Sequence, residues 1–226
     1  MHLTTQFGLT KTPKYYNTKL KMAFSICIQA GGESRRMGEN KALMLFAGQT
    51  LIKRVIERVK PLTDEIIIIS NDVESFQFLK LPVVPDHISG QGALSGLYTA
   101  LSAAKHPYVA VVACDMPFVN PELLKAECIL LINEQADVVI PQSPNGLEPL
   151  HAIYRRKTCL PFVHDALFQG KRRLIGWLEH VTVRVMSRVE VERYSPEFNA
   201  FVNLNTPEEF NEAEKLNRRL SSINHQ

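Results

Sequence analysis

Short apolar runs alternate along the chain with segments of helical periodicity. Ile66–Ile69 is a run of four β-branched residues, which is typical of a strand buried on both faces. Ala23–Ile28, Val109–Ala113 and Val138–Ile140 are similar runs and predict three further strands. Buried strands that alternate with helices indicate one α/β domain with a mostly parallel sheet covered on both faces.

Three helices are predicted between these strands. Apolar residues share one face of the first, namely Leu51, Ile52, Val55, Ile56 and Val59. The second has a comparable face made of Leu94, Leu97, Tyr98, Leu101 and Ala104. The third begins at Asn120-Pro121, because Asn caps a helix and Pro suits its first turn, and it is expected to reach about Glu134.

The C-terminal part is less regular. Val181–Met186 alternates loosely and predicts a strand. Thr206 and Glu209 have the spacing of a capping box around Pro207, which predicts a last helix. We therefore expect a single domain over residues 23–220 and a frayed tail over residues 221–226.

The composition adds that the protein is globular and that its excess of basic residues is local. Of its 226 residues, 45% are apolar and 22% are charged, and no apolar run is long enough to span a bilayer. The formal net charge is +3, but residues 1–22 hold four lysines and no acid, so the rest of the chain sums to −1. This balance argues against a general nucleic-acid binder. We interpret residues 1–22 as a flexible leader or a wrongly assigned start, with Met22 as the alternative first residue.

The four cysteines form no C-x-x-C pair, and each stands in or beside an apolar run. This pattern predicts reduced, mostly buried thiols and a cytoplasmic location, with no disulfide or zinc site.

Candidate chemistry begins directly after the first strand. Gln29, Ala30 and Gly31 open a small-residue loop whose backbone N–H groups could face phosphates, at the edge where open α/β sheets bind ligands. Arg36 and Lys41 add two cations that suit a triphosphate. The spacing matches neither a Walker loop nor G-x-G-x-x-G, so an ordinary glycine turn with solvated arginines stays open as an alternative.

Further polar residues follow other strands. Asp115 ends the run Val109–Ala113, where its carboxylate could hold Mg²⁺ jointly with substrate phosphates or simply cap the next turn. Three glycines in the segment 90–96 suggest either close approach to a ligand or a flexible turn before a helix. The remaining polar candidates, each of which alone is more often a turn or cap residue, are Asn71, Asp86, Asn203 and Asn205.

Five segments in series resemble the molybdenum cofactor guanylyltransferase family. They are a Gly-rich loop, a glycine turn, Cys-Asp-Met-Pro-Phe, Pro-Leu-His-Ala-Ile-Tyr and Asn-Leu-Asn-Thr-Pro-Glu, at residues 29–41, 92–96, 114–118, 149–154 and 203–208. The resemblance implies a Rossmann-like, three-layer fold of the nucleotide-diphospho-sugar transferase type. It implies an enzyme that transfers GMP from GTP to molybdopterin and releases pyrophosphate, with Mg²⁺ as cofactor. It also implies transient contact with the molybdenum-inserting enzyme or a recipient molybdoenzyme.

Carried over residue by residue, the resemblance assigns the first loop to GTP. The backbone of Gln29, Ala30 and Gly31 would meet the nucleotide, and Lys41 its phosphates. Arg36 would help to neutralise the phosphate charge.

The other matched positions divide between metal, base and acceptor. Asp115 would hold Mg²⁺, Asn71 and Asp86 fall at guanosine-binding positions, and Asn203 and Asn205 lie on the pterin side. The chain departs from the family pattern at two places: Gln29 replaces Leu, and Ala93 replaces Pro.

Three other functions stay open. A cytidylyltransferase for the same pterin tends to carry Ala-Gly where this chain has Gly31-Gly32, which favours guanine. Other small-molecule nucleotidyltransferases often have an added domain, for which this chain has little room. A non-catalytic nucleotide-binding or carrier protein is disfavoured because both Lys41 and Asp115 are present.

Overall fold

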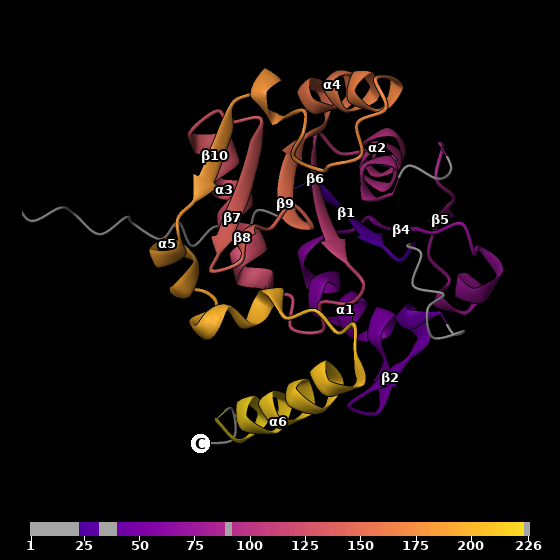
Figure 1. Cartoon of the computed structure of the whole chain (residues 1–226), viewed down its shortest axis with the longest axis vertical. Helices are drawn as coiled ribbons and strands as arrows, with labels where there is room; N and C mark the ends of the chain where they lie inside the picture. The colour runs from indigo at the N-terminus through magenta and orange to yellow at the C-terminus, as the bar shows by residue number, and fades with distance from the viewer. Residues whose placement is uncertain (1–22, 32–39, 89–91, 224–226) are drawn as a thin grey trace, which may run out of the picture.

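The computed structural model describes residues 23–31, 40–88 and 92–223. The predictions for residues 1–22, for Arg36 and for residues 224–226 lie outside this part of the chain. Within it, helices surround a central twisted sheet, and the C-terminal helix lies at the end of the molecule opposite α4 (Figure 1). None of the helices in the described ranges is long and apolar enough to cross a membrane.

The main sheet follows the order β10-β7-β9-β6-β1-β4-β5, with β8 paired to β7. Its strands are β1 (Phe24–Gln29), β4 (Ile66–Ile69), β5 (Val83–Val84), β6 (Tyr108–Ala113), β7 (Val138–Ser143), β8 (Gly146–Leu147), β9 (His151–Arg155) and β10 (Val183–Met186). A separate hairpin pairs β2 (Leu45–Phe46) with β3 (Gln49–Thr50).

The sheet is mixed but mostly parallel, as predicted. β6, β1, β4 and β5 are parallel neighbours, so their carboxyl ends share one edge. β9 was not foreseen as a strand: it runs antiparallel between β6 and β7. Its residues are buried from His151 to Tyr154, so the run lacks the polar alternation of a half-exposed strand.

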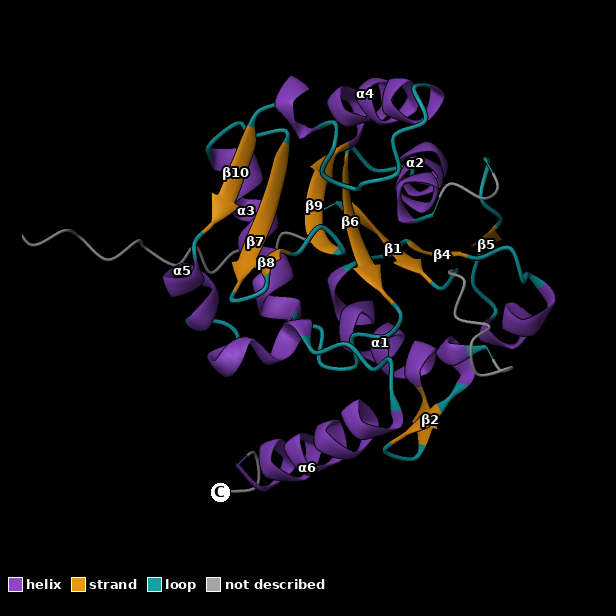
Figure 2. Ribbon diagram, viewed as in Figure 1, coloured by secondary structure: helices purple, strands orange, loops and turns teal. Residues whose placement is uncertain are grey.

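The α-helices of the described residues accompany the sheet (Figure 2). They are α1 (Leu51–Val59), α2 (Ala93–Ala103), α3 (Pro121–Asn133), α4 (Arg156–Phe168), α5 (Arg188–Glu192) and α6 (Pro207–Ile223). Short 3-10 turns are η2 (Lys41–Leu43), η3 (Lys60–Leu62), η4 (Glu74–Leu79), η5 (Leu178–His180) and η6 (Pro196–Phe201). The predicted caps are confirmed: the Asn120 side chain accepts from the amides of Glu122 and Leu123, and Thr206 and Glu209 form the reciprocal box.

Two apolar cores make the predicted three layers. Residues of α1, α3 and α5 pack with alternate strand residues on one face, for example Val55, Leu124 and Val191. On the other face, Leu97 of α2 and Val163 of α4 belong to a second core. Each core residue is withdrawn from water, which supplies roughly 1.5–3 kcal/mol for a fully buried large aliphatic side chain.

A smaller cluster sits beyond the sheet. Phe46 of the hairpin, Phe118 after β6 and Ala213 of α6 pack together, and Phe46 meets Phe118 edge-to-face at 5.7 Å. This cluster attaches α6, which runs to Ile223 and so includes the first three residues of the expected tail. All four cysteines are free, and Cys27, Cys128 and Cys159 are buried, as predicted.

Candidate active site

Lys41 joins two side chains that are far from it in the sequence. Its Nζ lies 2.6 Å from Asp115 Oδ2 and 2.5 Å from Asn205 Oδ1. The side chains of Lys41 and Asp115 are 13% and 21% exposed, so the pair is shielded but open to a ligand. Three residues that were predicted separately therefore form one polar cluster, in which an ammonium group bridges a carboxylate and a carboxamide.

Local structure fixes each member of the cluster. Lys41 opens η2, where the Asn40 side chain accepts from the Ala42 amide as the cap. Asp115 stands two residues beyond β6, and its carbonyl accepts from the Leu204 amide at 3.1 Å. That bond fastens the segment with Asn205 to the end of β6, which brings Asn205 within reach of Lys41.

A second polar pair lies farther along the same edge of the sheet. Asn71 follows β4 and Asp86 follows β5, and Asn71 Oδ1 accepts from the Asp86 amide at 2.8 Å. Burial raises the pKa of the Asp86 carboxyl, although its contact with Asn71 and the charge of His87 oppose this. Among the described residues, the buried Asp86 Oδ1 has no hydrogen-bond partner. It is a buried acceptor in a side chain that is only partly buried as a whole.

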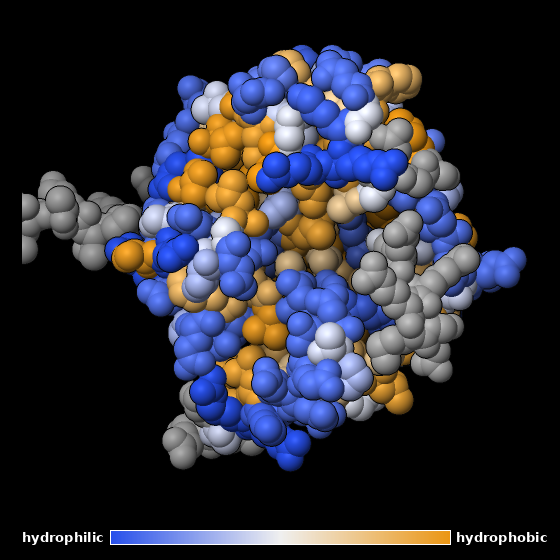
Figure 3. Space-filling model, in the orientation of Figure 1, coloured by the Kyte–Doolittle hydropathy of each residue, from blue (hydrophilic) through white to orange (hydrophobic). Residues whose placement is uncertain are grey.

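A hydrogen bond links the Lys41 cluster to the Asn71–Asp86 pair. Asn40 Nδ2 donates to Asp72 Oδ2 at 3.2 Å, which joins the residue before Lys41 to the residue after Asn71. Seen in space-filling form, the face of the molecule in this view is hollowed at its centre, between the part with α4 and the part with β2 and α6 (Figure 3). The strand ends thus carry the Asn71–Asp86 pair on one side and the Lys41–Asp115 pair on the other.

Two backbone groups at the start of the first loop are already paired within the sheet. The Ala30 amide donates to Ile69 and the Gln29 carbonyl accepts from Cys114, so both groups belong to the sheet. The predicted backbone contact of Gln29, Ala30 and Gly31 with a nucleotide stays a prediction. Gln29 is 7% exposed, and its carboxamide lies 2.8 Å from where a Cβ on Gly96 would stand.

The two departures from the family pattern meet in space. Gln29 Nε2 donates to the Ala93 carbonyl at 3.3 Å. A Pro-to-Ala change at the start of α2 and a Leu-to-Gln change at the end of β1 are therefore in direct contact. The Gln side chain ties α2 to the sheet by a hydrogen bond in place of apolar packing.

The two residues predicted on the pterin side, Asn203 and Asn205, have different partners. Asn205 joins the Lys41 cluster, whereas Asn203 Nδ2 donates to the Phe201 carbonyl at 3.2 Å within its own turn. The Asn203 side chain is therefore engaged within its own turn, and its assignment to the acceptor stays a prediction.

Sequence reasoning missed the groups that brace the turn after Asp115. Arg54 Nε donates to the Pro117 carbonyl at 3.1 Å, and Arg58 Nε donates to the Val119 carbonyl at 2.7 Å. The Arg54 guanidinium also lies 5.0 Å from the centroid of the Phe46 ring. In the sequence these arginines are recognisable only as part of the polar face of a helix. Their contact partners lie elsewhere in the chain, so the spacing within the helix does not reveal them.

The residues present fit a magnesium ion shared with a substrate. Within the described ranges there is no group of three or more His, Cys, Asp or Glu side chains that could hold a metal alone. Mg²⁺ is, however, commonly bound by one or two carboxylates together with substrate phosphates, and Asp115 is one such carboxylate at the ligand edge.

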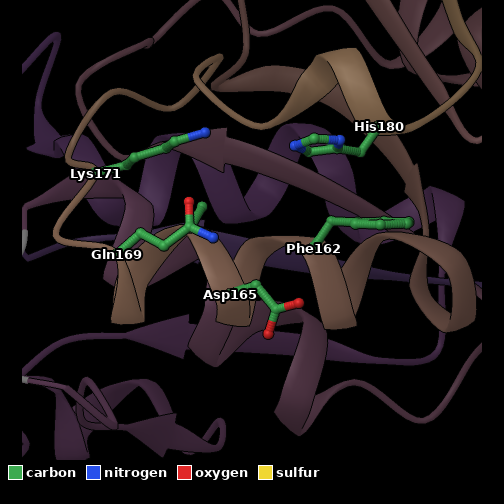
Figure 4. Close-up of a pocket in the computed structure, with 6 residues that line it drawn as sticks. Phe162, Asp165, Gln169, Lys171 and His180 are labelled. Carbon is green, nitrogen blue, oxygen red and sulfur yellow. The ribbon is translucent and has the colours of Figure 1, made fainter.

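A small pocket lies elsewhere, between α4 and the segment that follows it (Figure 4). Its volume is about 180 Å³, below the roughly 300–1,000 Å³ of typical small-molecule sites. His180 stacks on Phe162 at 5.5 Å, while Asp165, Gln169 and Lys171 complete most of the lining. None of the predicted site residues contributes to it, so the sheet edge is the better candidate.

Comparison with solved structures shows which known proteins share this fold. The crystal structure of molybdopterin-guanine dinucleotide biosynthesis protein A from Archaeoglobus fulgidus matches with a TM-score of 0.75 and 27% identity, covering 86% of this chain and 99% of that one. The 4-diphosphocytidyl-2C-methyl-D-erythritol synthase from Anaerococcus prevotii matches with a TM-score of 0.66 and 13% identity. The match covers 88% of this chain and 97% of that one, and it shows a shared fold. The fold is therefore the α/β fold of known nucleotidyltransferase structures.

Sequence comparison narrows that class. The model of the MobA-like NTP transferase domain matches residues 26–183, and the chain belongs to this family. The molybdenum cofactor guanylyltransferase of Desulfosudis oleivorans is 35% identical over 83% of this chain and 92% of its own length. A protein named as a probable molybdenum cofactor guanylyltransferase in Pelotomaculum thermopropionicum is 39% identical over 80% of this chain and 86% of its own length.

Proposed function

We propose that the protein transfers GMP from GTP to a molybdopterin-type acceptor and releases pyrophosphate. The names of its relatives support the substrates. The observation that carries the proposal is the contact of Lys41 with Asp115 and Asn205 at the carboxyl edge of the parallel strands. One charged pair there can serve the phosphates while the Asn71–Asp86 pair serves the base.

The reaction needs little acid–base catalysis from the protein. The acceptor's terminal phosphate attacks the α-phosphorus of GTP, a P–O bond to the acceptor forms, and the bond to the β-phosphate bridging oxygen breaks. A phosphate monoester has a second pKa of about 6, so the nucleophile is already largely dianionic near neutral pH. The protein must instead hold two anions in line and stabilise the charge that moves onto pyrophosphate.

Lys41 and Asp115 have complementary parts in that task. In the proposed complex, Lys41 turns from Asp115 to the nucleotide phosphates, and the carboxylate becomes available to a cation. Asp115 would hold Mg²⁺ jointly with those phosphates, where the ion neutralises negative charge. Arg36, which lies outside the described residues, is proposed as a further phosphate contact.

Recognition of guanine is assigned to Asp86 with Asn71. The half-buried Asp86 carboxylate lies beside the exposed Asn71 side chain, and its oxygens are acceptors for guanine N1–H and N2–H₂. Cytosine and adenine do not present that pair of donors. A site built on such bonds discriminates because an analogue leaves its buried polar groups unpaired.

Pyrophosphate release tests the proposal directly. The full chain is incubated with Mg²⁺, molybdopterin and GTP, CTP or ATP in separate reactions, and a reaction without acceptor serves as control. We expect acceptor-dependent release with GTP and far less with the other two. Equal release with CTP would favour the cytidylyltransferase alternative, and release that ignores the acceptor would reject the transfer reaction.

A further inference from the structure

A buried acidic–basic pair lies directly behind the carboxyl end of β6. Glu127 of α3 and His151, the first residue of β9, are both 0% exposed, and His151 Nδ1 lies 3.0 Å from Glu127 Oε1. Glu127 Oε2 and His151 Nε2 have no hydrogen-bond partner among the described residues. His151 therefore cannot reach a substrate as a proton donor, and the pair needs another explanation.

Stability alone does not explain the pair. Taking two ionisable groups out of water is costly, and apolar residues of similar volume often stabilise a core equally well or better. Burial raises the pKa of the Glu127 carboxyl to about 7, against the lowering effect of His151. What such a pair adds over apolar residues is a fixed ring orientation, because the hydrogen bond restrains His151 about its side-chain torsions.

The orientation matters because of what the ring touches. His151 stands opposite Val112 of β6, three residues before Asp115, and the Ala113 amide donates to the Leu150 carbonyl at 3.1 Å. The same ring meets Phe201 edge-to-face, with centroids 5.2 Å apart and planes at 84°. The pair thus contacts both the strand that leads to Asp115 and the segment that leads to Asn205.

The segment after Phe201 needs such support. Glu197 and Phe198, just before it, have φ values of 57° and 55°, a left-handed conformation that costs non-glycine residues about 1–2 kcal/mol each. From Phe201 the chain runs to Leu204, whose amide donates to the Asp115 carbonyl. It then reaches Asn205, which accepts from Lys41.

We propose that His151, oriented by Glu127, is a positioning residue that sets the segment Phe201–Asn205 against Asp115. The pair holds the Phe201 ring in place, and the backbone bond from Leu204 carries that placement to Asp115 and Lys41. The inference rests on the proposed nucleotidyl transfer, since that function gives the Lys41–Asp115–Asn205 cluster its task.

The test replaces the pair by apolar residues so that folding is kept. In E127M/H151F neither ionisable group is left buried alone, and an aromatic ring is retained at position 151. Glu127→Gln keeps an acceptor for His151 Nδ1–H and is the conservative variant. Val163→Ala on α4, in the core on the opposite face of the sheet, is a matched variant that loosens packing away from the cluster.

Two readouts are measured beside the melting temperature. The first is kcat and KM for GTP in acceptor-dependent pyrophosphate release. The second is the ratio of GTP dissociation constants without and with Mg²⁺, by calorimetry. We expect E127M/H151F to melt within a few degrees of the wild type while kcat falls about ten- to a hundredfold and the Mg²⁺ ratio shrinks. Glu127→Gln should retain both values, and Val163→Ala should lower the melting temperature alone.

The outcomes separate the two ideas. If E127M/H151F keeps the wild-type kcat and Mg²⁺ ratio, or if Glu127→Gln loses them equally, the positioning role is rejected. If the wild type fails to transfer GMP, the proposed function fails, and the Mg²⁺ ratio alone still decides whether the pair positions Asp115.

Discussion

Lys41 and Asp115 are separated by 74 residues in sequence and meet at 2.6 Å. One opens a short turn beyond β1, and the other follows β6, the strand beside β1 in the sheet. Their contact makes the two halves of the candidate site one electrostatic unit. In the proposed complex a nucleotide with its metal divides this pair, so each partner can be tested separately.

Asp115→Asn is expected to abolish most activity without unfolding the protein. Asn is nearly isosteric and can still accept from Lys41, so thermal melting should change little. It lacks the charge proposed to hold Mg²⁺, and loss of such a stabiliser costs about 10²–10³ in kcat. Single-turnover transfer at saturating GTP and Mg²⁺ measures the effect. A near-native rate would show that Asp115 is only a turn residue.

Lys41→Met is expected to weaken GTP binding. A charge-assisted hydrogen bond contributes about 1.5–3 kcal/mol, so KM for GTP should rise roughly ten- to a hundredfold. Lys105→Met is the matched control, since Lys105 is 87% exposed and pairs with Glu65 at the surface. The role of Lys41 in phosphate binding would be refuted by equal KM values for both variants.

Asp86→Asn is expected to reduce the preference for GTP over CTP and ATP. The change removes one acceptor from a partly buried base site, which should lower the ratio of kcat/KM values about ten- to a hundredfold. Asp64→Asn, at an exposed carboxyl paired with His106, is the control. Unchanged selectivity in Asp86→Asn would move base recognition elsewhere.

The same residue predicts a pH effect on GTP affinity. Burial raises the pKa of Asp86, so its charged, accepting form is lost at a higher pH than for an ordinary aspartate. We expect GTP affinity to fall as the pH is lowered through that raised pKa, and the fall to be absent in Asp86→Asn. Calorimetric titrations at several pH values would show it, and parallel pH profiles for both proteins would contradict it.

Glu127 gives a pH dependence of stability with a defined sign. Its pKa is raised from 4.5 to about 7 by burial, so the folded state binds the proton more tightly than the unfolded chain. The resulting stabilisation is complete below about pH 4.5 and is lost as the pH rises through about 7. The Gln amide in Glu127→Gln imitates the protonated carboxyl, so this variant keeps the stabilisation as the pH rises.

The stability of the wild type relative to Glu127→Gln should therefore fall by about 1–3 kcal/mol between pH 4.5 and pH 8. Urea unfolding of both proteins across that range measures the difference. A constant difference would mean that Glu127 stays in one protonation state throughout, and a rising one would reverse the sign.

The sequence by itself determined the layered fold and the identity of most polar candidates. Ile66–Ile69 and Val109–Ala113 form buried strands because apolar runs of that length have few other places in a globular chain. The caps at Asn120 and Thr206 are local in sequence, so their hydrogen bonds follow from spacing alone. The motifs at Lys41 and Asp115 were readable for the same reason.

Only the tertiary structure decided which candidates meet. The antiparallel β9 places His151 beside β6, and no local pattern marks the direction of a fully buried strand. The bond from Leu204 to Asp115 brings Asn205 to Lys41 and leaves Asn203 in its own turn. Such contacts join residues that are far apart in the sequence. The packing of the whole sheet decides which of these contacts form, because the spacing of side chains along the chain does not say which strands are neighbours.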